Sequence, residues 1–213
     1  AWAFNTTSAF GGRLRDVPFA NGPYRVMDDC VTVLPGAAAD VFEPDVAAKL
    51  DACCKRQFVR LRDNPLFLGY FFGNEQPFEK VPVVVPGLSG KFAAKRRLVQ
   101  FLQDRYGDIE DFKRAWVISV SAFADLVDLK LPVTTPAAKA DMDDFFALYC
   151  DTYGKLLRQA VRKHDPNHLL LGFRWMPSTA RNKTLVENLG RHMDVISINY
   201  YTQAGINSQY LAQ

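Results

Sequence analysis

Several patterns that commonly reveal the class of a protein are missing from this chain. No apolar run approaches the roughly 18 residues that a membrane-spanning helix requires. No C-x-x-C spacing points to zinc, no G-x-G-x-x-G or phosphate-binding loop points to a nucleotide, and no G-x-S-x-G elbow supports a catalytic serine. We therefore expect no membrane insertion, no structural zinc site, no glycine-rich nucleotide site and no serine hydrolase of that type.

An excess of charge of one sign is also missing. The 213 residues hold 26 Lys and Arg against 23 Asp and Glu, which gives a formal net charge of +3. The basic residues are dispersed, and the longest basic run, residues 95–97, is typical of the solvated face of a helix. Because a nucleic-acid binder usually concentrates its positive charge on one face, we expect no nucleic-acid partner.

Cysteine and histidine are few, and neither forms a metal-binding pattern. Histidine, aspartate and glutamate have no spacing typical of a catalytic metal site, so no metal and no cofactor are expected. His164 and His168 flank a predicted turn and are expected to cap a helix or to lie at the surface. The four cysteines are Cys30, Cys53, Cys54 and Cys150. They are expected to be buried free thiols, and a disulfide between two of them is the alternative.

The chain is rich in apolar sequence, which alternates between two periodicities. Hydrophobic residues make up 48% and aromatic residues 13%, which is enough for one domain with a core. Strands are predicted at residues 2–9, 24–34, 66–73, 169–175 and 194–200. Helices are predicted at residues 46–60, 89–106, 108–116, 119–126, 139–164 and 183–189.

Three local signals refine these boundaries. Asp45 is predicted to cap the helix that follows it. Residues 81–87, VPVVVPG, hold two prolines and are predicted to be a loop or a short edge segment. Residues 131–141 are predicted to be a linker within the domain.

The alternation of strands and helices predicts an α/β fold with a parallel sheet. Residues 66–73 lack polar alternation, which indicates burial on both faces of such a sheet. Two architectures are consistent with this order of strands and helices: an open doubly wound sheet and a (β/α)8 TIM barrel. The missing glycine-rich turn favours the barrel, in which chemistry takes place at the carboxyl ends of the strands.

Polar and aromatic side chains follow the predicted strands at those ends. A charged group after a buried strand is costly unless it is paired or used, and Glu75 follows the strand that reads FLGYFFGNE. Aromatic faces and fixed polar groups at one rim are typical of a sugar site. The candidate residues are Asn5, Asn74, Glu75, Arg174, Trp175, Asn199, Tyr200 and Tyr201.

Each candidate also has a structural alternative. Glu75 could form a structural ion pair with Arg174, and Trp175 could pack in the core. Tyr200 and Tyr201 face opposite sides of a continuing strand, so only one of them needs to reach the site.

Four stretches resemble the clan A glycoside hydrolases, and among them the β-agarase-like proteins of glycoside hydrolase family 50. NPLFLGYFFGNE resembles the fourth-strand motif that ends in Asn-Glu, and HDPNHLLLGFRW resembles the turn and fifth strand of the β-agarase-like members. DVISINYY resembles their sixth strand, and AWAFNTTSAF is similar to their second. The order and spacing agree over most of the chain.

This resemblance implies roles for the candidate residues. Glu75 would be the general acid/base, with a pKa raised by burial and by a nearby anion. Asn74 would bind the sugar 2-hydroxyl, and Arg174 and Trp175 would line subsites. One tyrosine after Asn199 would orient the nucleophile.

The resemblance also implies that the chain covers about strands 2 to 6 of a barrel. Residues 1–213 are expected to form one (β/α)-barrel catalytic segment with a helical insert at about residues 76–138. The nucleophile, a glutamate after the seventh strand, is expected beyond the C-terminal end of the chain. Glu187 precedes the sixth strand and is misplaced for that role.

The leading hypothesis is a retaining β-glycoside hydrolase that acts on a galactan or agarose-like polysaccharide without a cofactor. The family resemblance favours a secreted or periplasmic location. One alternative is a non-catalytic carbohydrate-binding or degenerate barrel, and another is an α/β enzyme of a different class with a structural Glu75–Arg174 pair.

Overall fold

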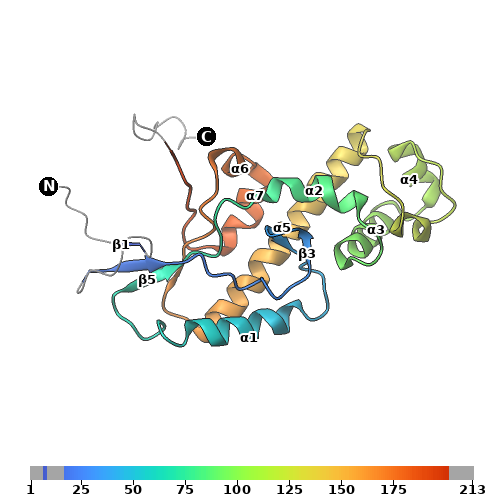
Figure 1. The fold of residues 1–213 in the computed structure, drawn as a ribbon. Helices are drawn as coiled ribbons and strands as arrows, with labels where there is room; N and C mark the ends of the chain where they lie inside the picture. The colour runs from blue at the N-terminus through green and yellow to red at the C-terminus, as the bar shows by residue number, and fades with distance from the viewer. Residues whose placement is uncertain (1–6, 9–16, 202–213) are drawn as a thin grey trace.

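The computed structural model describes residues 7–8 and 17–201, and these form an α/β structure around a parallel sheet (Figure 1). The sheet has four strands in the order β1-β2-β5-β6, and all neighbours are parallel. The strands are short: β1 (Thr7–Ser8), β2 (Phe19–Asn21), β5 (Phe67–Tyr70) and β6 (Leu169–Leu170). Among the described strands, the spatial order follows the chain order without reversal.

The second strand does not lie where the sequence predicted it. β2 precedes the predicted range 24–34, of which only β3 (Thr32–Leu34) is extended, in an antiparallel pair with β4 (Ala38–Ala39) outside the parallel sheet. Gly22 ends β2 at φ +136°, and a Cβ there would lie 2.5 Å from the carbonyl oxygen of Phe71. The Tyr24 amide still donates to Phe71 O at 2.6 Å, and the backbone then leaves the sheet in a turn at residues 26–29, inside the run that we had assigned to a strand.

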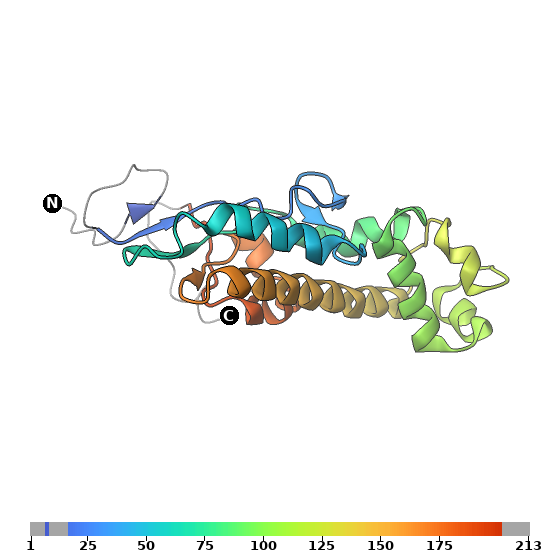
Figure 2. The ribbon, with the colours of Figure 1, turned by 90° about the horizontal axis from the view of Figure 1, so that it is seen from below.

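Two helices run side by side along the molecule, α1 (Val46–Phe58) and α5 (Pro136–His164) (Figures 1 and 2). Both were predicted. α5 starts earlier than expected because Pro136 occupies its first turn, where no backbone N–H is needed. The predicted linker 131–141 is therefore wrong from Pro136 onward.

The predicted cap of α1 is wrong in its chemistry. Asp45 occupies the N-cap position, but its side chain accepts no capping hydrogen bond. Asp45 Oδ2 instead lies 2.9 Å from Lys49 Nζ, one helical turn further on. In contrast, Thr135 at the start of α5 does accept a hydrogen bond from the Ala138 amide at 3.0 Å.

A series of helical elements connects β5 to α5, and the later ones form the end of the molecule that lies far from the sheet (Figure 1). The proline-rich run 81–87 is helical, so its prediction as a loop was wrong. Each of its two prolines lies in the first turn of a helical element, where proline is tolerated. The elements are η2 (Phe78–Lys80), α2 (Val81–Val84), η3 (Val85–Gly87), α3 (Ala93–Tyr106), α4 (Ile109–Trp116) and η4 (Phe123–Val127).

Two buried charges hold these helices in place. Lys95 is fully buried, and its Nζ donates to the carbonyl oxygens of Pro86 and Leu129 at 2.7 Å each. Asp141 on α5 accepts hydrogen bonds from Arg105, Tyr106 and Trp116 at 2.6 to 2.7 Å. Because buried charges require such partners, Lys95 holds the helical segment 78–127 together internally, and Asp141 attaches this segment to α5.

After β6 the chain forms three short helical elements and returns to the sheet. These are α6 (Pro177–Ala180), α7 (Lys183–Asn188), where a helix was predicted, and η5 (Gly190–His192). The two strands predicted at 169–175 and 194–200 are mostly irregular. They are joined by one parallel bridge between Trp175 and Ile198.

A buried polar network lies at the start of β6 and contains His168. Asp165 is fully buried and accepts a hydrogen bond from Tyr70, and it also lies 2.7 Å from His168 Nδ1. His168 Nε2 lies 3.1 Å from the carbonyl oxygen of Asn64. His168 is therefore buried between two partners, and its predicted place at a helix cap or the surface was wrong. His164 was predicted for the same setting, but it pairs with Asp51 across α1 and α5 at 2.8 Å.

The cysteines match their prediction, because all four are free and buried. Within residues 7–8 and 17–201, no helix combines the length and apolar composition needed to cross a membrane. The same residues hold no group of three or more His, Cys, Asp or Glu side chains placed to bind a metal ion.

Candidate active site

Three loops at the carboxyl ends of parallel strands bring the candidate residues together. The loop after β5 carries Asn74 and Glu75, and the Phe72 amide donates to Gly172 O at 2.9 Å, which sets this loop beside the segment after β6. The backbone amide of Asn199 donates to Trp175 O at 2.8 Å, which sets the segment that carries Asn199 beside the segment after β6. The convergence follows from parallel pairing, since such strands place their carboxyl ends at one edge.

Glu75 is the centre of the hydrogen bonds at this edge. Its Oε1 accepts one hydrogen bond from the Tyr201 hydroxyl at 2.6 Å and one from Asn199 Nδ2 at 2.7 Å. Asn199 Nδ2 also lies 3.3 Å from Asn74 Oδ1. Four of the predicted site residues therefore lie together: Asn74, Glu75, Asn199 and Tyr201. More than 120 positions of the sequence separate the first two from the last two.

Arg174 sets the orientation of Asn199. Its Nε donates to Asn199 Oδ1 at 3.2 Å, so the opposite side of that amide, Nδ2, faces Glu75. The guanidinium lies over the ring of Phe71 at 5.7 Å, which restrains it further. Arg174 thus acts on Glu75 through Asn199 as well as through its positive charge.

Two residues of this site have an unusual backbone conformation. Glu75 has φ +61° and Arg174 has φ +52°, in the left-handed region that residues with a Cβ rarely adopt. The other described non-glycine residue with positive φ, Val117, ends α4, where this conformation is common. Strain at two facing residues of a loop cluster is typical of a functional site.

The pKa of Glu75 is lower than its usual value, which corrects the expected rise. The hydrogen bonds from Tyr201 and Asn199 lower the pKa of this carboxyl, with a smaller contribution from the charge of Arg174. Its limited burial acts in the opposite direction but is outweighed. The apolar environment that was to raise the pKa is absent because Phe67, Tyr70 and Phe72 point into the core.

Tyr201→Phe is expected to raise the pKa of Glu75 because it removes the largest of the effects that lower it. A 13C NMR titration of the Glu75 carboxyl carbon measures the change directly. Tyr106→Phe is the matched control, since the Tyr106 hydroxyl donates to a different carboxylate, that of Asp141, at 2.7 Å. An unchanged Glu75 titration in Tyr201→Phe would show that the hydroxyl does not bind this carboxylate in solution.

The remaining candidates have different environments. Trp175 is only 1% exposed and stacks on Phe173 with ring centroids 5.9 Å apart, so it packs in the core, as its alternative expected. Tyr200 is half-buried, and Tyr201 is the tyrosine that reaches Glu75. Asn5 lies outside the described residues.

Sequence reasoning missed two residues that support this site. Ser197 Oγ accepts a hydrogen bond from the Arg174 amide at 2.9 Å and so holds its strained backbone. Phe71 lies beneath the Arg174 guanidinium. Ser197 could have been found as the polar residue two positions before Asn199 in an otherwise apolar strand.

No protein-family model matches the chain. In sequence it is similar to β-agarase B of Vibrio sp. (strain JT0107), with 24% identity over 182 residues. That alignment covers 79% of this chain and 19% of the relative. The chain therefore spans about a fifth of the length of the curated relative that it matches.

Solved structures share the fold. An exo-β-agarase superposes with a TM-score of 0.76 at 26% identity, covering 87% of this chain and 27% of that protein. PfGH50B superposes with a TM-score of 0.80 at 21% identity, covering 92% of this chain and 30% of that protein. The agarase AgWH50C has a TM-score of 0.76 at 24% identity and the corresponding coverages are 87% and 28%. In sequence and in fold, this chain is therefore β-agarase-like.

Proposed function

We propose that this chain carries the acid/base half of a retaining β-glycoside hydrolase that cleaves an agarose-like galactan. The observation that carries this proposal is the place of Glu75, a strained carboxylate at the carboxyl edge of a parallel sheet, bound by an amide and a phenol. The likeness to proteins named as β-agarases supports the substrate class.

The barrel belongs to the same proposal. In an open doubly wound sheet the order of strands reverses at a switch point, and ligands bind there. The described strands follow one another without reversal, as they do in a (β/α)8 barrel. Superposition on glycosidase structures, including a haloarchaeal β-galactosidase at a TM-score of 0.56, also supports strands of such a barrel.

In the proposed first step, a protonated Glu75 donates its proton to the glycosidic oxygen as the bond to C1 breaks. A second carboxyl group, which in a retaining enzyme lies about 5–5.5 Å from the acid/base carboxyl, forms a covalent bond to C1. In the second step Glu75 takes a proton from water, which attacks C1 and releases the sugar with its original configuration. We assign no residue as the nucleophile, since the side chains of the described residues that act on the Glu75 carboxyl are Tyr201, Asn199 and Arg174, and none of them is a carboxylate.

Because the pKa of Glu75 is lowered in the free protein, substrate binding has to raise it before Glu75 can donate a proton. The Tyr201 hydroxyl donates to Oε1 at 2.6 Å, and we expect a glycosidic oxygen that approaches Oε1 to displace it. When a sugar displaces this hydroxyl and excludes water, the carboxyl loses its strongest stabilising partner and its pKa rises. A neighbouring anionic nucleophile raises it further. Asn74 and Asn199 remain to bind sugar hydroxyls.

The experiment that tests this function is the hydrolysis of agarose by the whole protein, with the product anomer followed by 1H NMR in the first minutes. We expect agarose cleavage with the β-anomer of the new reducing end formed first. An α-anomer formed first would exclude retention. Cleavage of other β-linked polysaccharides but not of agarose would exclude the substrate class.

A non-catalytic carbohydrate-binding protein is the second candidate. The ionised, doubly hydrogen-bonded Glu75 favours it, since such a carboxylate can bind a sugar hydroxyl without donating a proton. This candidate predicts binding of agarose-derived oligosaccharides without cleavage. Either function fits a protein outside the cytoplasm, because the polymer substrate is too large to enter the cell; a secreted or periplasmic location is proposed on that ground.

A further inference from the structure

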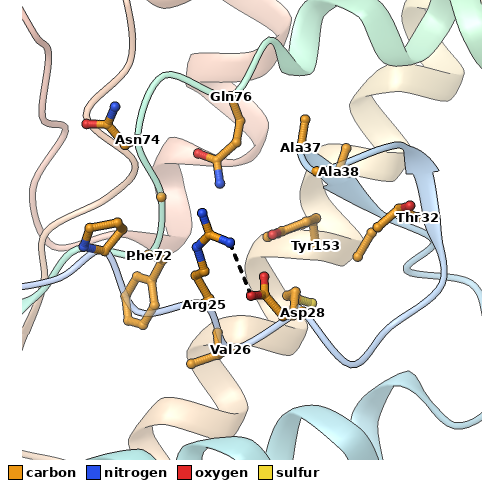
Figure 3. Close-up of a pocket in the computed structure, with 15 residues that line it drawn as sticks. Arg25, Val26, Asp28, Thr32, Ala37, Ala38, Phe72, Asn74, Gln76 and Tyr153 are labelled. Carbon is orange, nitrogen blue, oxygen red and sulfur yellow. Dashed lines mark ion pairs between the residues drawn. The ribbon is translucent and has the colours of Figure 1, made fainter.

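A second hollow, which we name the Arg25 pocket, lies next to the candidate active site. Its volume is about 330 Å³, near the lower end of the range for small-molecule sites. It lies between the loop after β2, the β3–β4 hairpin and the loop that carries Asn74, and Tyr153 of α5 forms its floor (Figure 3). Asn74 belongs both to this pocket and to the hydrogen-bonded group around Glu75.

The charges inside the pocket cancel. Arg25 Nη1 lies 3.5 Å from Asp28 Oδ2, and both side chains remain largely exposed. Figure 3 shows the guanidinium pointing toward the carboxamide of Gln76. A guanidinium paired with a carboxylate offers both donors and acceptors without net charge, which suits hydroxyl groups better than a free anion.

Gln76 supplies an unused hydrogen-bonding group. A Cβ on Gly73 would lie only 1.9 Å from Gln76 Oε1, so the absence of a side chain there lets the carboxamide fold back over the loop. Gln76 Oε1 is buried and has no hydrogen-bond partner among the described residues. Because Oε1 lies against Gly73 with almost no exposed surface, the end of the carboxamide that faces the pocket is the nitrogen, which can donate to a ligand hydroxyl (Figure 3).

The other walls are apolar, which is the complement of the C–H face of a sugar ring. Phe72 and Tyr153 are buried aromatic residues of the lining, and Met27 and Ala37 add aliphatic surface. Phe72 and Tyr153 are only 4% and 3% exposed, so they add small apolar patches to the lining rather than open ring faces, and such patches beside a few fixed polar groups are usual in a ligand site.

We propose that the Arg25 pocket binds one uncharged glycosyl residue of a polysaccharide whose cleaved bond lies at Glu75. This inference rests on the proposed function for the cleavage, but binding to the pocket can be measured without it. Asn74 connects the two sites, so a bound chain passes from one to the other along the loop 73–76. The pocket then selects for neutral galactan over sulfated galactan at this position.

The test compares the binding of an agarose-derived hexasaccharide to variants of the whole protein by isothermal titration calorimetry. Arg25→Ala removes the polar wall, and Ala37→Trp fills the pocket. We expect at least a tenfold weaker Kd for both. Val31→Trp is the matched control because Val31 is exposed on the same hairpin but does not line the pocket, and its Kd should equal that of the wild type.

Charge is tested separately with Asp28→Asn, which leaves the guanidinium of Arg25 without its carboxylate. We expect this variant to bind a sulfated galactan hexasaccharide at least fivefold more tightly than the wild type does. An unchanged affinity would overturn the assignment of Arg25 to the sugar. Wild-type affinity for the neutral hexasaccharide in both Arg25→Ala and Ala37→Trp would overturn the subsite itself.

The binding test of the Arg25 pocket does not depend on whether the protein cleaves agarose. If the protein cleaves nothing, calorimetry still decides the pocket. If Ala37→Trp does not fold, as circular dichroism would show, Arg25→Ala decides, because Arg25 is a surface side chain with an exposed fraction of 77%.

Discussion

Glu75→Gln is expected to lower kcat/KM on agarose by about two to four orders of magnitude, the usual contribution of a general acid. Glutamine keeps the size of the side chain and accepts the hydrogen bonds from Tyr201 and Asn199, but it has no proton to donate to the glycosidic oxygen. The loss should therefore come from chemistry and leave substrate binding almost intact. Steady-state kinetics on agarose with a reducing-end assay measures it.

The leaving group distinguishes an acid from a binding residue. An aryl galactoside with a good leaving group needs no protonation, so Glu75→Gln should form its glycosyl-enzyme at nearly the wild-type rate, measured as a burst of phenol. An equal loss on agarose and on the aryl galactoside would rule out the acid role. Glu187→Gln is the control: it carries the same substitution at a surface ion pair with Lys183 and should change neither rate.

Asp165→Ala is expected to lower the free energy of unfolding by about 3–5 kcal/mol, the usual cost of removing one partner from a buried charged network. Asp165 accepts hydrogen bonds from Tyr70 and from two backbone amides, and it pairs with His168. Alanine leaves these donors without their acceptor, and the Tyr70 hydroxyl and the His168 ring are buried. Urea unfolding followed by tryptophan fluorescence measures the change.

The same network predicts a pH dependence. Burial raises the pKa of Asp165, but the hydrogen bonds from Tyr70, His168 and the backbone outweigh it, so its pKa lies below the usual value. A lowered carboxyl pKa stabilises the folded state above the pKa of the unfolded chain, and this stabilisation is lost as the pH falls through the folded-state pKa. The difference in the free energy of unfolding between wild type and Asp165→Ala should therefore become smaller below about pH 4.

A surface aspartate provides the comparison. Asp63 lies a few residues from the same network, but it is exposed and forms a surface ion pair with Arg62 at 3.3 Å. Asp63→Ala should cost less than about 1 kcal/mol because exposed ion pairs are screened by water. Similar losses in the two variants would mean that the Asp165 network does not stabilise the domain.

Much of the architecture could be read from periodicity alone. Apolar spacing located α1 and α5, and an unbroken apolar run located β5 as a buried parallel strand. Such patterns are local, so a single sequence contains them in full. The second strand was missed because its end is not a local feature. It depends on how closely Gly22 approaches Phe71, almost fifty positions later in the sequence.

What the sequence determined by itself was the type of structure and the position of its polar groups: parallel strands, each followed by the residues that later meet around Glu75. Only the tertiary structure decided what these groups do to one another. It placed Tyr201 and Asn199 on the carboxyl of Glu75 and so lowered its pKa, and it buried Trp175. The physical reason is distance: strand ends are encoded by neighbours along the chain, whereas a pKa depends on charges and donors a few ångströms away in space.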